Sequence, residues 1–204
     1  ASDVYKRQVL IGEVDPVEIL FPGGKSIDAL TTFYREGGDF AANNDMIGIA
    51  VKELMAKMPE RRSIRILEVG AGTGSLTRAV LPVLPPEQSE FTFTDTSPAF
   101  LSDAKKQFSD YNFVEYTTFD IEKDPEGQGV DVHGYDLILG TNVVHATSDL
   151  KNTLANITRC LSDDGVLMFL EVTNERVTLN NVFGLLKGWW FYQDTDLRPT
   201  CLLY

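Results

Sequence analysis

The stretch that decides the fold is Ile64-Arg-Ile-Leu-Glu-Val-Gly-Ala-Gly-Thr-Gly74, in which an apolar strand runs into three alternate glycines. Glycine tolerates positive φ and carries no Cβ, so a turn of this kind lets the backbone come close to a ligand. At Gly70, Gly72 and Gly74 we therefore expect a side chain to occupy space that the ligand needs. The stretch predicts a cofactor-binding turn, and a turn that only packs a strand on a helix is the alternative.

The spacing of these glycines separates two classes of cofactor. A dinucleotide fingerprint reads G-x-G-x-x-G and rests a pyrophosphate on a helix N-terminus. Here the third glycine comes one place early, and Ser75 stands where the fingerprint has its last glycine. Glu68 adds a carboxylate that repels a pyrophosphate and suits a cationic or hydroxyl-rich ligand. The pattern favours S-adenosylmethionine over NAD, and it argues against an NAD-dependent reductase.

Strands alternate with helices from residue 64 onward. We expect helices at 75–84, 98–108 and 149–160, and strands at 64–69, 91–94, 112–116, 135–140 and 166–171. This order predicts an α/β fold with a Rossmann-like, doubly wound and mostly parallel sheet. Ligands of such sheets bind outside the carboxyl ends of the strands, so we expect the site at that edge.

The sheet is expected to occupy the middle of three parts. Residues 1–60 are expected to form an N-terminal linker and helical cap, with two helices around Gly37-Gly38. Residues 61–174 would form the cofactor-binding core, and residues 175–204 the start of a lid that includes Trp189 and Trp190. The chain begins without Met and stops at Tyr204 without a closing element. We therefore expect it to be a piece of a longer polypeptide.

The composition argues against several classes of function. Thirty acidic against 18 basic residues give a net charge of −12, which opposes the phosphate neutralisation that nucleic-acid binding needs. No run approaches the roughly 18 apolar residues of a membrane span, and no signal peptide is recognisable. Cys160 and Cys201 lack the spacing of a zinc site. We expect a cytoplasmic protein with no nucleic acid, membrane or metal partner.

Acidic side chains stand where three successive strands of this scheme end, namely Glu68, Asp95 and Asp120. Because the carboxyl ends of parallel strands meet at one edge, we expect all three to face one crevice. An acid after the second strand can hold both ribose hydroxyls of an adenosine. Asp120 could accept a hydrogen bond from the adenine amino group, while Ile121 or Phe119 lies along the ring. The alternative for each acid is a solvated loop carboxylate or a helix cap.

Several motifs of the sequence resemble those of one enzyme family. The stretch from Ile66 to Gly74 resembles the first motif of class I S-adenosylmethionine-dependent methyltransferases. Further stretches resemble the C-methyltransferase domains of polyketide synthases, among them Phe93-Thr-Asp-Thr-Ser97, Phe119-Asp-Ile-Glu122, Asn142-Val-Val-His-Ala-Thr147, Leu170-Glu-Val172 and Phe183-Gly-Leu-Leu-Lys-Gly-Trp-Trp190, the last together with Arg198. Asn-x-x-His-Ala-Thr followed by Gly-Trp-Trp is the most specific part, because the glycine motif is shared by many methyltransferases.

The resemblance implies a reaction and a set of residues. The reaction is methylation of the α-carbon of a β-ketoacyl thioester on an acyl carrier protein, beside neighbouring synthase domains of the same polypeptide. His145 and Glu171 would form the catalytic pair. Cofactor contacts would come from Glu68, Gly70, Gly72, Gly74, Asp95, Thr96, Asp120, Ile121 and Asn142. Because the family's fold continues past its fifth strand, we expect the last strands to be missing from this chain.

The chemistry of the reaction supports the roles predicted for His145 and Glu171 independently of the resemblance. A base must remove a proton from the carbon between ketone and thioester, and imidazole, with a reference pKa of about 6.5, is largely neutral at cytoplasmic pH. His145 follows one expected strand and Glu171 ends the next, and neighbouring strands lie only about 5 Å apart. A carboxylate on one imidazole nitrogen fixes the tautomer and leaves the other nitrogen free to act as the base.

Two alternatives stay open on the sequence alone. An N-methyltransferase of a peptide synthetase, or a small-molecule O-methyltransferase, would share the cofactor motifs. An amide or hydroxyl acceptor, however, does not require the pair of His145 and Glu171. A non-catalytic methyltransferase-like scaffold domain is the second alternative, and the intact motif residues argue against it.

Overall fold

The computed structural model describes residues 7–15, 38–59, 62–173, 179–180 and 183–199. At its centre lies a five-stranded sheet of order β3-β2-β1-β4-β5, in which all four neighbouring pairs are parallel. The strands are β1 (Ile64–Glu68), β2 (Ser89–Asp95), β3 (Val114–Thr118), β4 (Tyr135–Thr141) and β5 (Leu161–Leu170). The expected doubly wound parallel fold is confirmed.

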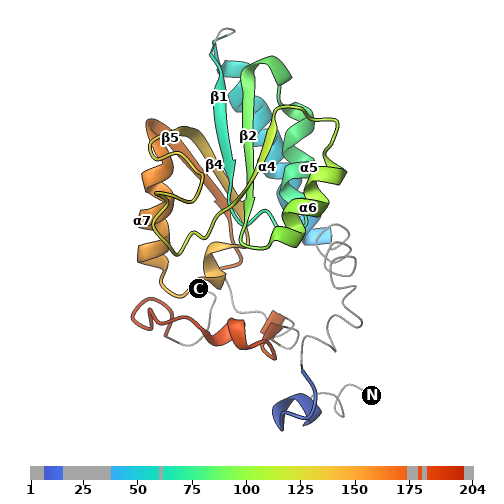
Figure 1. The fold of residues 1–204 in the computed structure, drawn as a ribbon, viewed down its shortest axis with the longest axis vertical. Helices are drawn as coiled ribbons and strands as arrows, with labels where there is room; N and C mark the ends of the chain where they lie inside the picture. Colours follow the sequence, from blue (N-terminus) through green and yellow to red (C-terminus); the bar gives the residue numbers. More distant parts are fainter. Residues whose placement is uncertain (1–6, 16–37, 60–61, 174–178, 181–182, 200–204) are drawn as a thin grey trace.

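Helices cover both faces of the sheet (Figure 1). One face carries α4 (Gly38–Lys57), α5 (Ser75–Val80) and α6 (Pro98–Gln107), and the other carries α7 (Leu150–Cys160). Side chains of β1 alternate between the two faces, since Ile66 packs in the cluster under α4 to α6 and Leu67 in the cluster under α7. This two-sided burial explains why β1 reads as a nearly continuous apolar run.

Several element bounds differ from the expected ones, and for three of them the structure shows the cause. The helix from Ser75 ends at Val80 and continues as a 3-10 turn, Leu81–Val83, because Pro82 offers no N–H to an α-helix. Strand β3 begins at Val114, two residues later than expected, since a turn precedes it. Strand β5 begins at Leu161, five residues before the expected start at residue 166. A register shift against β4 accommodates the additional residues.

Of the expected N-terminal cap, the structure describes residues 7–15 and, after residue 37, the helix α4. It is the second of the two helices expected around Gly37-Gly38, and the first lies outside the described residues. Ile47 and Val51 are buried against the sheet cluster. Gly48 allows a close approach to α5, because a Cβ there would lie 2.7 Å from the carbonyl oxygen of Ala79. Among the described residues, no helix combines the length and the apolarity needed to cross a membrane.

Candidate active site

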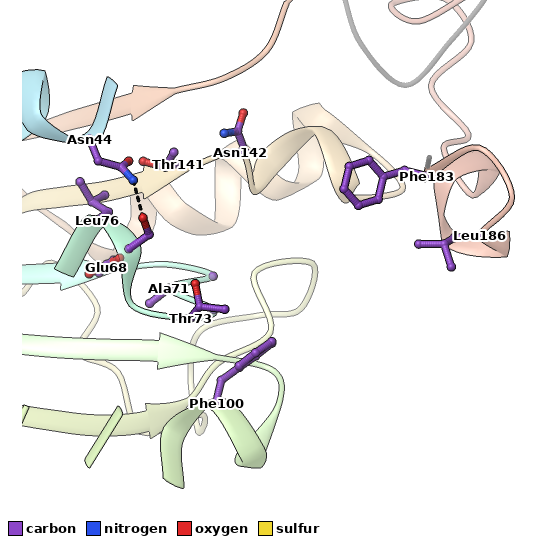
Figure 2. A pocket seen from close by; sticks show the side chains of 13 residues that line it. Asn44, Glu68, Ala71, Thr73, Leu76, Phe100, Thr141, Asn142, Phe183 and Leu186 are labelled. Atoms are coloured by element: carbon purple, nitrogen blue, oxygen red, sulfur yellow. Dashed lines mark hydrogen bonds between the residues drawn. The ribbon is translucent and has the colours of Figure 1, made fainter. Parts of the chain in front are cut away.

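A cavity of about 380 Å³ lies at the carboxyl ends of β1 and β4. Its lining comes from α4, the glycine turn, α5, α6, the end of β4 and the segment 183–186: Asn44, Glu68, Gly70, Ala71, Gly72, Thr73, Ser75, Leu76, Phe100, Thr141, Asn142, Phe183 and Leu186. Figure 2 shows Asn44, Glu68 and Leu76 next to the strands, with Phe183 and Leu186 farther out. The cavity therefore lies at the edge of the sheet where a ligand was expected.

The three glycines of the turn all have positive φ, but each serves a different purpose. At Gly72 an added Cβ would meet nothing closer than 3.9 Å, so this residue borders open space in the cavity. At Gly70 a Cβ would lie 2.1 Å from the Val143 side chain, and at Gly74 it would lie 2.6 Å from the Phe108 ring. The prediction that all three glycines make room for a ligand is therefore corrected at Gly70 and Gly74, where the backbone packs against protein.

Asp95 ties the glycine turn to the end of β2. Its Oδ2 accepts a hydrogen bond of 3.0 Å from the Gly72 N–H, and its Oδ1 accepts one of 2.8 Å from the Ser97 N–H. Each carboxylate oxygen has a second lone pair, which a hydroxyl group can use. The side chain is thus anchored to the backbone and still able to accept from a ribose. Thr96, the next residue, is exposed.

Glu68 is buried at the inner wall of the cavity. Burial removes water from the carboxylate and raises the pKa of Glu68 to about 8, although a 2.7 Å hydrogen bond from Thr77 Oγ1 favours the charged form. Loss of solvation outweighs the hydrogen bonds that Thr77 gives through its side chain and its backbone. A cationic group of a ligand would supply the missing compensation.

This shift in pKa makes stability depend on pH. The ordinary value of 4.5 applies to the unfolded chain and the value of about 8 to the folded chain. Between these limits the folded state holds a proton that the unfolded state has lost, so the free energy of unfolding should fall as pH rises. We expect the melting temperature of ligand-free protein to be lower at pH 8 than at pH 5, and Glu68→Gln to remove this part of the slope. Glu53→Gln, a change at an exposed position of α4, is the control and should leave the slope unchanged.

Three buried polar atoms at the cavity have no hydrogen-bond partner among the described residues: Asn44 Oδ1, Thr141 Oγ1 and Asn142 Nδ2. Their side chains are otherwise held in place, since Asn44 Nδ2 donates to Ser75 Oγ at 2.8 Å and Asn142 Oδ1 accepts from Val172 N at 3.1 Å. Buried polar atoms normally have partners, so these three indicate a polar ligand. Together with Glu68 they offer both donors and acceptors, which suits the ammonium and carboxylate groups of an amino acid.

His145 and Glu171 are in contact. His145 Nδ1 lies 2.6 Å from Glu171 Oε2, and each side chain is only 15% exposed. The other oxygen of Glu171 accepts hydrogen bonds from the N–H groups of Val143, at 2.7 Å, and Val144, at 2.9 Å. With Glu171 on Nδ1, Nε2 is the nitrogen that can accept a proton. The sequence predicted this contact, but gave no sign of the two backbone donors.

Asp120 and Ile121 lie away from the cavity lining. Asp120 Oδ2 pairs with Lys123 Nζ at 2.9 Å, and its backbone N–H donates to Gln128 Oε1. Ile121 and Phe119 are buried in the cluster under α7. The structure thus brings Glu68 and Asp95 to the glycine turn and leaves Asp120 apart, so the role of Asp120 at an adenine ring stays a prediction.

Aromatic side chains lie beside His145. The buried Trp189 ring stands edge-on to the His145 ring at 6.2 Å between centroids, and it stacks on Phe183 at 5.6 Å. Trp190 and Phe191 are exposed. The segment that we expected to form a lid therefore places one indole next to His145 and one phenyl ring in the cavity wall.

Residues 67–167 match the family model described as "Methyltransferase domain". Among curated proteins, the chain is 39% identical over 193 residues to the non-reducing polyketide synthase pkiA of Emericella nidulans. That alignment covers 91% of this chain but only 8% of the synthase, so the chain corresponds to a small part of its relative's length.

Solved structures of methyltransferases are also similar to this chain. The CurJ carbon methyltransferase superposes with a TM-score of 0.90 at 42% identity, over 96% of this chain and 52% of that one. The CMeT domain of the citrinin polyketide synthase gives 0.85 at 34%, over 92% and 50%. The trans-methyltransferase CalH, solved as a complex with SAH, gives 0.76 at 32%, over 97% and 53%. The chain spans about half the length of each.

Proposed function

We propose, because this chain belongs to the C-methyltransferase domains of polyketide synthases, that it methylates the α-carbon of a β-ketoacyl thioester with S-adenosylmethionine. An acyl carrier protein would present the thioester, and neighbouring synthase domains would make and use it in the cytoplasm. The observation that carries the proposal is the contact of 2.6 Å between His145 Nδ1 and Glu171 Oε2. Neither residue lines the cavity itself, but Asn142, which does, accepts a hydrogen bond from the N–H of Val172, the residue after Glu171.

The residues around the cavity fit S-adenosylmethionine, which supplies an electrophilic methyl carbon on a sulfonium when bound. Glu68, Asn44 Oδ1 and Asn142 Nδ2 offer a carboxylate, an acceptor and a donor for its amino-acid end. Asp95 can accept from the ribose hydroxyls, and the backbone at Gly72 borders open space. A pyrophosphate would instead meet the carboxylate of Glu68, and for this reason NAD fits less well.

The catalytic pair fits the removal of a carbon-bound proton. His145 Nε2 would take the proton from the carbon between ketone and thioester, and the electron pair left behind becomes an enolate. Glu171 would stabilise the resulting imidazolium through Nδ1–H. The enolate carbon would then be the nucleophile toward the methyl carbon that the cofactor supplies, with the sulfur as the leaving group. The N–H groups of Val143 and Val144 hold Glu171 in the orientation that this requires.

The pair also favours carbon as the acceptor over nitrogen or oxygen. An amide or hydroxyl nucleophile carries its own lone pair, and its transfer does not depend on a base that creates a carbanion. Glu171 is 15% exposed and both of its carboxylate oxygens are hydrogen-bonded, so it can support a demanding proton transfer at His145.

Titration calorimetry tests the cofactor site. We expect micromolar binding of S-adenosylmethionine, no binding of NADPH, and an affinity lower by at least about tenfold, or ~1.4 kcal/mol, in Asp95→Ala. The variant loses both the acceptor for the ribose and the anchor of Gly72. Asp103→Ala removes an exposed carboxylate of α6 that pairs with Lys106, and it serves as the matched control. Unchanged affinity in Asp95→Ala would contradict the assigned ribose site.

A further inference from the structure

We propose that Arg198 is a positioning residue for His145, acting through the backbone that carries the imidazole. This inference rests on the proposed function, in which His145 is the base. Arg198 lies 53 residues from His145 in sequence, yet its side chain ends at the connection between β4 and α7. It does not touch the imidazole ring in any contact that the structure describes.

The Arg198 guanidinium binds three carbonyl oxygens of this connection. It is 1% exposed. Nη1 donates to His145 O at 2.8 Å, while Nη2 donates to Thr147 O at 2.8 Å and Ser148 O at 3.2 Å. A planar fork with donors in fixed directions is suited to such a set of acceptors, which a single ammonium group cannot reach together. Arg198 thereby joins three peptide groups around the base into one rigid unit.

Asp194 makes the burial of this cation possible. A buried guanidinium is strongly unfavourable unless an opposite charge compensates it. Asp194 Oδ1 accepts from Arg198 Nε at 2.6 Å, and Asp194 Oδ2 accepts from the Leu150 N–H at 2.9 Å. Tyr192 lies against the guanidinium, 5.1 Å from ring centroid to Cζ. The ion pair therefore connects the residues around His145 to the first turn of α7.

The same connection is held by a second carboxylate. Glu122, in the loop after β3, accepts a hydrogen bond of 2.8 Å from the Ser148 N–H and another from Ser148 Oγ. Asn152, in α7, donates to the Glu122 carbonyl at 2.9 Å. The peptide chain between His145 and α7 is thus fixed at both its carbonyl and its N–H groups. The ring of His145 is held by Glu171, and its backbone carbonyl is held by Arg198.

A fixed backbone matters because proton transfer from carbon depends steeply on geometry. The accepting nitrogen must come within about 2.6–3.2 Å of the group that gives up the proton, and a displacement of roughly 1 Å can cost about 100-fold in rate. Glu171 fixes Nδ1, the plane of the ring and the backbone before His145, whereas Arg198 fixes the carbonyl after its Cα. Loosening the carbonyl of His145 would therefore move Nε2 while the contact to Glu171 persists.

The test uses Arg198→Lys in the complete polypeptide that carries this chain. Lysine keeps the charge for Asp194, but its three N–H donors cannot serve Asp194 and all three carbonyls together. We measure kcat and KM for methylation of a β-ketoacyl thioester, enzyme-dependent exchange of its α-proton in D2O, and the Kd of S-adenosylmethionine. We expect kcat and the exchange rate to fall together by about 10- to 100-fold, with Kd and KM changed by less than about threefold. Arg159→Lys, an arginine of α7 paired with Asp124 and Glu126, is the matched control and should behave as wild type.

Each result has a defined meaning. Wild-type kcat and exchange in Arg198→Lys would overturn the positioning role, as would equal losses of kcat and cofactor affinity, which indicate a general disturbance of the fold. If Arg198→Lys does not fold, Tyr192→Ala decides, because it leaves Arg198 in place and removes only the ring against it. We then expect a smaller loss, about 3- to 10-fold, in exchange and kcat alone, and no loss would overturn the role. If wild type shows neither exchange nor methylation, the proposed function fails, and the role of Arg198 fails with it.

Discussion

In His145→Ala the rate of C-methylation is expected to fall by about 10²- to 10⁴-fold, the usual contribution of a general base. Alanine removes the nitrogen that takes the α-proton, while Glu171 keeps its hydrogen bonds from the N–H groups of Val143 and Val144. The backbone around position 145 should thus persist. Mass spectrometry of the acyl product measures the loss, and calorimetry should find cofactor affinity within about threefold of wild type.

His133→Asn is the control for this experiment. His133 lies in the exposed loop before β4 with φ of 55°, a conformation that asparagine tolerates well. We expect wild-type methylation in this variant. Undiminished methylation in His145→Ala would show that His145 is not the base, and would favour an N- or O-methyltransferase that needs no carbanion.

In Glu171→Gln we expect a loss of similar size, about 10²- to 10⁴-fold in kcat. The amide oxygen can still accept from the Val143 and Val144 N–H groups, but its NH₂ group must then face His145 Nδ1. An NH₂ group donates, so it selects the imidazole tautomer with the hydrogen on Nε2. The nitrogen that should accept the α-proton is then blocked, although the architecture remains intact.

Two measurements separate this tautomer effect from a structural one. The melting temperature of Glu171→Gln should stay within a few degrees of wild type, because about the same number of hydrogen bonds is kept. Glu115→Gln, a change at an exposed position of β3, is the matched control for loss of a negative charge. A Glu171→Gln enzyme with wild-type kcat would mean that the carboxylate only supports the backbone.

Much of the fold and part of the site could be predicted because they depend on local pattern. The alternation of strands and helices and the motifs from Glu68 to Glu171 predicted a parallel sheet and the methyltransferase family, and both are confirmed. The contact of His145 with Glu171 was predictable for a simple geometric reason. His145 follows β4 and Glu171 follows β5, the neighbouring strand, and parallel strands end at the same edge of a sheet.

The remaining parts of the site depend on packing that no local pattern records. Asn44 reaches the cavity because α4 comes close to α5 at Gly48, and its partner Ser75 is 31 residues away in sequence. Gly74 reads as one more residue of a cofactor turn, yet its missing side chain makes room for the ring of Phe108. Nothing in the sequence around Arg198 indicates its burial, and only the folded chain shows that it is buried with Asp194.

Glu171 binds both the His145 ring and two backbone N–H groups. This affects the order in which a domain of this kind would lose its functional residues during evolution. Mutation of Glu171 removes the partner of the base and also leaves the N–H groups of Val143 and Val144 without an acceptor, so selection for a folded protein acts on it even when activity is no longer needed. The described contacts of the His145 side chain include no hydrogen bond to a backbone group, so its loss leaves no such group without a partner. In homologous domains that have lost their activity, we therefore expect the histidine to be substituted first and the glutamate to be retained.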